Sequence, residues 1–174
     1  MHPRSKQRSL LGAKSAARAA AARAVKFATD DDGETTLEGV GIPWGGPWNG
    51  QDSYGEHFSA KTDLALEWYA ERPLLYQHGI DSGVGIAAVG RVKAWEIKAD
   101  TGLWVQAQLD ASSEYFDAIS ELVRRGKLYF SSGAMSHLVR VDKASGEIKR
   151  WPWCELSLTP TPANLYATLD LADA

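Results

Sequence analysis

Ser131 is the side chain best placed in this sequence to act as a nucleophile. It lies in the run Leu128 to Ala134, where two adjacent hydroxyls end a short apolar segment directly after a predicted amphipathic helix. Because Ser-Ser-Gly also closes ordinary strands, the motif alone is weak and needs partners elsewhere in the chain. A serine nucleophile requires a general base within hydrogen-bond reach. The base in turn requires an acid that holds its tautomer and stabilises its cation.

His78 and Glu155 are the candidate partners of this serine. His78 ends an apolar run that begins at Leu74, and a glycine follows it. Glu155 interrupts the otherwise apolar segment Trp153 to Leu158. On position alone, a histidine such as His78 is a hydrogen-bonded structural residue, but its combination with the serine and glutamate motifs favours a catalytic base. The sequence therefore predicts one nucleophile, one base and one acid.

Three other side chains compete for these roles. His57 is a rival base, but it lies in a polar loop with no apolar strand to fix its position. Cys154 is a rival nucleophile, but successive residues of a strand face opposite ways, so it cannot share a site with Glu155. A buried structural thiol is the preferred interpretation of Cys154. His137 and His57 remain alternative third members of the site if Glu155 is not the acid.

Together the three motifs resemble the prohead maturation proteases of tailed bacteriophages. The resemblance lies in His-Gly after an apolar run, Ser-x-Gly after a helix, and a following Glu-x-Ser-Leu-Thr-Pro-Thr-Pro-Ala-Asn, and it covers about Gly39 to Leu169. It implies a serine protease distantly similar in fold to the herpesvirus assemblins. By this resemblance Ser131 is the nucleophile and His78 the base. The third member is a histidine in assemblins and usually acidic in the phage enzymes, which implies Glu155 here.

The same resemblance implies a function and a place of action. It implies an endopeptidase that cleaves major capsid protein and scaffold segments, and itself, inside the phage prohead assembled in the bacterial host cytoplasm. Assemblins stabilise the oxyanion with arginines that are absent here, where the proline-set turn Thr159 to Asn164 stands. A backbone N–H near Asn164, or at Ser132 or Gly133, is the candidate donor instead. Self-association is left open.

A competing hypothesis comes from a different class of protein. A non-catalytic capsid-associated or scaffold-associated protein could keep the same fold and act through a basic N-terminal arm. Residues 1–29 carry seven Lys and Arg and no acidic residue, whereas the remaining twelve basic and twenty-two acidic residues sum to −10. Such an arm is interpreted as a solvated, partly helical segment, as an arm that binds nucleic acid or scaffold, or as a removable propeptide.

Composition and charge define two regions and exclude several classes of site. The basic arm and the acidic linker Asp30 to Glu34 form the region 1–34, and residues 35–174 form one domain. No stretch approaches the ~20 apolar residues of a transmembrane helix, so no membrane partner is expected. A single cysteine, Cys154, excludes an internal disulfide and a zinc cluster. No cofactor and no metal are predicted.

The hydrophobic pattern predicts a mostly-β, α+β domain: a small barrel or strongly bent sheet with two or three helices. One predicted hairpin pairs a long glycine-containing strand with a cleanly alternating one, and a second hairpin leads into the strand that carries Glu155. Ser112 or Ser113 is expected to cap the longer helix. The expected strands are Leu37–Trp44, Leu74–His78, Val84–Ile97, Leu103–Leu109, Leu128–Ser132, His137–Val141, Glu147–Trp151 and Trp153–Leu158, and the expected helices are Thr62–Ala70 and 115–123.

Overall fold

The computed structural model describes residues 28–29 and 35–171. The predicted basic arm and acidic linker therefore lie, apart from residues 28–29, outside the described residues. The described chain is mostly β, with one α-helix among the described elements. Among these residues, no helix has both the length and the apolar character needed to cross a bilayer.

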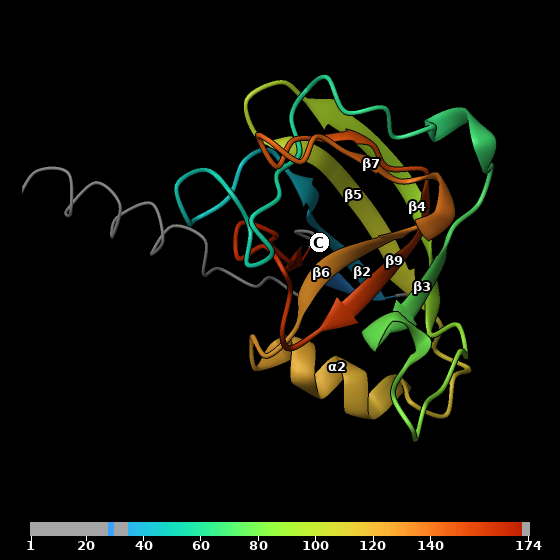
Figure 1. The fold of residues 1–174 in the computed structure, drawn as a ribbon. Helices are drawn as coiled ribbons and strands as arrows, with labels where there is room; N and C mark the ends of the chain where they lie inside the picture. The colour runs from blue at the N-terminus through green and yellow to red at the C-terminus, as the bar shows by residue number, and fades with distance from the viewer. Residues whose placement is uncertain (1–27, 30–34, 172–174) are drawn as a thin grey trace, which may run out of the picture.

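One curled sheet of eight strands forms the body of the protein (Figure 1). Its strand order is β1-β2-β5-β4-β3-β9-β6, and β10 also pairs with β2. Every pairing is antiparallel except that of β3 with β9, which is parallel. The strands are β1 (Ala28–Thr29), β2 (Thr35–Pro43), β3 (Pro73–Tyr76), β4 (Gly90–Lys98), β5 (Gly102–Leu109), β6 (Tyr129–Ala134), β9 (Trp153–Thr159) and β10 (Asp170–Leu171).

The two predicted hairpins are confirmed. β4 and β5 pair across the turn at residues 99–101, although β4 begins at Gly90 and not at the predicted Val84. Register shifts between Val40 and Ile42 and between Val92 and Ala94 mark bulges, which bend strands and suit a sheet that curls. The second hairpin joins β7 (Arg140–Val141) to β8 (Ile148–Arg150) as a separate two-stranded sheet just before β9. Its first strand is shorter than the predicted His137–Val141, because Ser136–Leu138 form a 3-10 turn instead.

The only α-helix of the described residues is α2 (Phe116–Arg124), which lies at one end of the sheet (Figure 1). Its apolar positions Ile119 and Val123 are buried, and Gly126, at φ 61°, follows its end as predicted. The predicted cap by Ser112 or Ser113 is wrong, because the helix begins at Phe116 after Tyr115 and no side chain caps its first turn. Three short 3-10 helices accompany it: η1 (Leu66–Trp68), η2 (Gln77–Gly79) and η3 (Ser136–Leu138).

The predicted helix over Thr62–Ala70 is wrong, since only the 3-10 turn η1 forms there. The backbone of Asp63 pairs with the chain beside β8 instead: its N–H donates to the Lys149 carbonyl at 3.0 Å, and its carbonyl accepts from the Trp151 N–H at 2.8 Å. Ala65 then adopts a left-handed conformation with φ 48°. Long-range backbone pairing thus replaces the local hydrogen bonds that a helix would need.

A buried arginine fixes this segment against the start of β9. Arg72 is fully buried, and its guanidinium donates to the carbonyl oxygens of Trp153, Tyr69 and Leu66 at 2.9, 3.0 and 3.0 Å. It also lies over the rings of Trp95 and Trp153, 4.6 and 4.2 Å from their centroids. Burial lowers the pKa of Arg72, and the carbonyl dipoles and aromatic faces stabilise its charge. The strand that carries Glu155 is therefore anchored at its first residue.

Candidate active site

Ser131 lies on β6, the last strand in the sheet order, and faces away from the core. Its neighbour Phe130 is fully buried on the opposite face of the strand. In the antiparallel pairing with β9, Ser131 stands opposite Ser157, and Gly133 stands opposite Glu155. Residues two apart on a strand share a face, so all four lie on the same side of the sheet. The register of β6 and β9 thus brings the predicted nucleophile and acid together.

His78 reaches this face from η2, which follows β3. The predicted strand through His78 ends two residues early, at Tyr76, because Gln77, His78 and Gly79 all adopt left-handed conformations, with φ of 47, 57 and 73°. This turn brings the ring of His78 to Ser131 and Glu155. Left-handed conformations are unfavourable for residues with a Cβ, and such strain is concentrated at functional sites. Two residues of this turn carry such strain, Gln77 and the candidate base His78.

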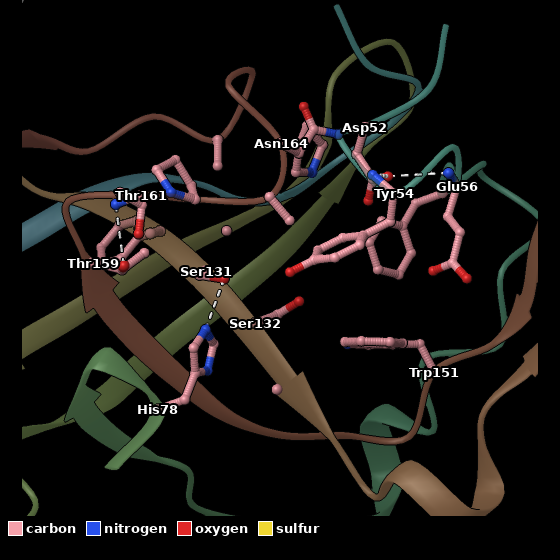
Figure 2. Close-up of a pocket in the computed structure, with 18 of the residues that line it drawn as sticks. Asp52, Tyr54, Glu56, His78, Ser131, Ser132, Trp151, Thr159, Thr161 and Asn164 are labelled. Atoms are coloured by element: carbon pink, nitrogen blue, oxygen red, sulfur yellow. Dashed lines mark hydrogen bonds between the residues drawn. The ribbon is translucent and has the colours of Figure 1, made fainter. Parts of the chain in front are cut away.

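The three predicted side chains form a continuous hydrogen-bonded chain. His78 Nε2 lies 3.0 Å from Ser131 Oγ, and His78 Nδ1 lies 2.6 Å from Glu155 Oε1 (Figure 2 marks the former). With a proton on Nδ1 directed at the carboxylate, Nε2 is free to accept the hydroxyl proton of Ser131. The side chain of His78 is 36% exposed and that of Glu155 only 13%. The base is thus open to a reactant while its acid is shielded from water.

Ser157 joins this chain as a fourth residue, which the sequence analysis did not single out. Its hydroxyl donates to Glu155 Oε2 at 2.8 Å and accepts from the backbone N–H of His78 at 3.0 Å. Ser157 is fully buried. One hydroxyl thus holds the second carboxylate oxygen of the acid and the strained backbone of the base. The spacing Glu-x-Ser on a predicted strand is the signal that could have identified it.

Gly133 makes room for the acid. A Cβ on Gly133 would lie 1.8 Å from Glu155 Oε1 and 2.6 Å from Glu155 Cδ, so no larger residue fits without displacing the carboxylate. Its φ is not in the left-handed region, so glycine is required here for space and not for conformation. This explains the glycine of the Ser-x-Gly motif in physical terms.

A cavity of about 470 Å³ opens beside the triad. His78 and Ser131 lie at one end of it, and Tyr54, Glu56 and Trp151 lie at the other (Figure 2). Residues of the turn Thr159 to Asn164 form part of its wall. The side chain of Asn164 is itself occupied, since its Nδ2 donates to the carbonyl of Gly45 at 2.7 Å. A backbone N–H as the oxyanion donor therefore stays a prediction.

The rival side chains lie elsewhere. His57 and His137 are absent from the lining of the cavity, and His137 is exposed in η3. Cys154 does not line the cavity either, and its thiol lies 3.5 Å from the carbonyl oxygen of Gly133. Burial, and secondarily the charge of Glu155, raises the pKa of Cys154, which disfavours the reactive thiolate. In the described part of the chain, no group of three or more His, Cys, Asp or Glu side chains is arranged to hold a metal ion.

Comparison of the whole chain with protein-family models, with curated proteins and with solved structures returns no match.

Proposed function

We propose that this protein is a serine endopeptidase of the phage prohead maturation type. The proposal rests on two hydrogen bonds. His78 Nε2 lies 3.0 Å from Ser131 Oγ, and His78 Nδ1 lies 2.6 Å from Glu155 Oε1. A nucleophile, a base and an orienting acid within hydrogen-bond reach define this reaction class independently of fold and chain order. The cavity beside Ser131 gives a substrate access to the nucleophile.

The chemistry follows from these contacts. His78 Nε2 takes the proton of Ser131 as Oγ attacks the scissile carbonyl carbon and forms a tetrahedral intermediate. Glu155 stabilises the resulting imidazolium through Nδ1. His78 then gives the proton to the leaving amine as the C–N bond breaks, which leaves an ester on Ser131. Water, deprotonated by His78, hydrolyses that ester and restores the serine.

The substrate class rests on the resemblance of the three motifs to prohead proteases. It assigns capsid-protein and scaffold segments as substrates, together with the chain itself, inside the immature shell. The curled, mostly-β sheet with its single described α-helix is compatible with the bent-sheet or barrel fold that this resemblance implies. The competing hypothesis is a non-catalytic capsid or scaffold-associated protein that acts through residues 1–29.

A fluorophosphonate probe separates the two hypotheses, because it modifies only an activated serine. We expect the full-length protein to be labelled at one residue, Ser131, and Ser131→Ala to abolish both labelling and peptide cleavage. Ser132→Ala is the matched control for the nucleophile: the Ser132 hydroxyl lines the cavity but faces away from His78 on β6, so this variant should keep probe labelling and most of the activity. If Ser132 is the labelled residue, the assignment of the nucleophile is wrong. Absence of labelling contradicts the enzyme proposal, and salt-sensitive binding of residues 1–29 to an acidic scaffold or nucleic acid becomes the next measurement.

A further inference from the structure

The end of the cavity away from His78 combines two aromatic rings with one carboxylate. Tyr54, Glu56 and Trp151 gather around it, and the side chain of Ser132 extends toward it from β6 (Figure 2). The ring of Trp151 is held edge-to-face by Phe58, with centroids 5.3 Å apart. A fixed aromatic face such as that of Trp151 covers the aliphatic stem of a long side chain and attracts a cation at its tip, and Tyr54, which is 79% exposed, adds a second ring at the mouth of the cavity.

The charges that line the cavity are of one sign. Asp52 and Glu56 contribute carboxylates, and neither lysine nor arginine is among the lining residues. The two acids differ in their surroundings. Asp52 is buried, and its Oδ1 accepts the backbone N–H groups of Tyr54 and Glu56 at 2.8 and 3.0 Å, so this carboxylate stabilises the turn. The cavity is therefore electronegative, and Glu56 supplies the carboxylate that accepts no hydrogen bond from the backbone of this turn.

The carboxylate of Glu56 has no hydrogen bond or ion pair with any residue that the structure describes. Arg140 and Lys143 line a neighbouring hollow that shares the turn at residues 54–56, and neither of them pairs with Glu56. Partial burial, and then the charge of Asp52, raises the pKa of Glu56. Both effects disfavour its ionised form, and a cation placed in the cavity would offset both.

We propose that this end of the cavity is a specificity site that binds the lysine or arginine side chain of the substrate residue whose carbonyl Ser131 attacks, with Glu56 as its anionic partner and the rings of Tyr54 and Trp151 as its walls. The inference rests on the proposed protease function and names its substrate class. The first support for it is that Ser131 and Glu56 line the same cavity, so a substrate bound at Ser131 can extend a side chain toward Glu56. The inference also follows from charge, because a guanidinium or ammonium group is the chemistry that an unpaired carboxylate beside aromatic rings selects.

The chain carries a substrate of this kind in its own sequence. Residues 1–29 contain seven Lys and Arg and no acid, and Arg23 and Lys26 are the basic residues nearest the acidic linker. Cleavage after either one would remove almost the whole arm. We therefore expect the purified full-length protein to shorten on standing to a form that begins at Ala24 or Phe27, as read by intact mass. Ser131→Ala protein should stay full length under the same handling.

The decisive test compares fluorogenic peptides that span residues 19–25 and differ only at position 23, which is arginine, norleucine or glutamate. We expect kcat/KM of the wild-type protein for the arginine peptide to exceed that for norleucine by about tenfold or more, with glutamate the poorest. Glu56→Gln keeps the shape of the side chain and removes its charge, so it should lower the arginine-to-norleucine ratio about tenfold. Glu56→Lys should reverse the order of the arginine and glutamate peptides.

Glu96→Gln is the matched control, because Glu96 is an exposed carboxylate on β4 outside the cavity, and it should keep the wild-type ratio. An unchanged ratio in Glu56→Gln, or equal cleavage of arginine and norleucine peptides by the wild type, overturns the specificity site. Fluorophosphonate labelling of the wild type shows whether a negative result contradicts only the specificity site or also the proposed protease function. A protein labelled at Ser131 without a preference for basic residues refutes this inference alone, whereas an unlabelled protein refutes the proposed function as well.

Discussion

Substituting Gly133 with alanine tests the geometry of the triad without touching any of its members. The new Cβ would lie 1.8 Å from Glu155 Oε1, whereas Cβ contacts below 3.0 Å are essentially never found, so the oxygen must retreat by at least 1.2 Å (3.0 minus 1.8). That oxygen now lies 2.6 Å from His78 Nδ1. A misplacement of about 1 Å in an active site costs about 10²-fold in rate, and loss of the orienting acid costs about 10⁴-fold. We expect kcat/KM of Gly133→Ala to fall by about 10²- to 10⁴-fold.

The assay measures kcat/KM for a fluorogenic peptide together with the thermal unfolding midpoint. Gly83→Ala is the control, because a Cβ there meets only Asp81 Oδ1, at 3.3 Å, and Gly83 does not line the cavity. A compensating change sharpens the test. Glu155→Asp withdraws the carboxylate by one methylene and should lower activity in the wild-type background. In the Gly133→Ala background the same change relieves the clash and should raise activity, which is the non-additivity expected of residues in contact.

Wild-type kcat/KM in Gly133→Ala would refute this reasoning, because Glu155 could then move by more than 1 Å without consequence. Additive effects of Gly133→Ala and Glu155→Asp would refute it too, since they would show that the two positions do not compete for the same space. A lower unfolding midpoint with unchanged kcat/KM would mean that Gly133 serves only packing.

Two further predictions concern the acid and the residue that holds it. Glu155→Gln keeps the shape and removes the charge, so turnover should fall by about 10²- to 10⁴-fold with little change in the unfolding midpoint, and wild-type turnover would remove Glu155 from the mechanism. Ser157→Ala removes the donor to Glu155 Oε2 and the acceptor for the His78 N–H, and should lower kcat/KM about 10- to 100-fold. Ser157→Thr keeps the hydroxyl and should recover part of that loss, whereas equal losses in both variants would assign Ser157 to packing alone.

The sheet and the main helix were predictable because their signals are local. Strict alternation identified β5, the apolar spacing of Ile119 and Val123 identified α2, and the turn at residues 99–101 identified the first hairpin. The errors fall where distant contacts override such signals. The segment Thr62–Ala70 looks helical by composition, but its backbone pairs with Lys149 and Trp151, which are more than eighty residues away. Local pattern carries no information about that pairing.

The candidate site divides in the same way. The sequence predicted Ser131, His78 and Glu155 from the chemistry of their motifs, and the structure brings the three together. The contributions of Ser157 and Gly133 depend on the register of β6 against β9, which the sequence does not reveal. The left-handed turn at His78 was equally hidden, because such a conformation is unfavourable locally and is maintained by a bond to Ser157 from another strand.

The register of three adjacent strands also explains why one serine of the pair, and not the other, faces the base. Ser131 stands opposite Ser157 of β9, and Ser157 stands opposite Leu75 of β3, just before the turn that carries His78. A slip of one residue in β6 would put Ser132 on the His78 face and Ser131 in the core. Phe130 prevents this slip. The side chain of Phe130 is fully buried, and a slip would move that side chain out of the core while burying a serine hydroxyl. The apolar residue that stabilises the edge of the sheet therefore also determines which hydroxyl meets the base.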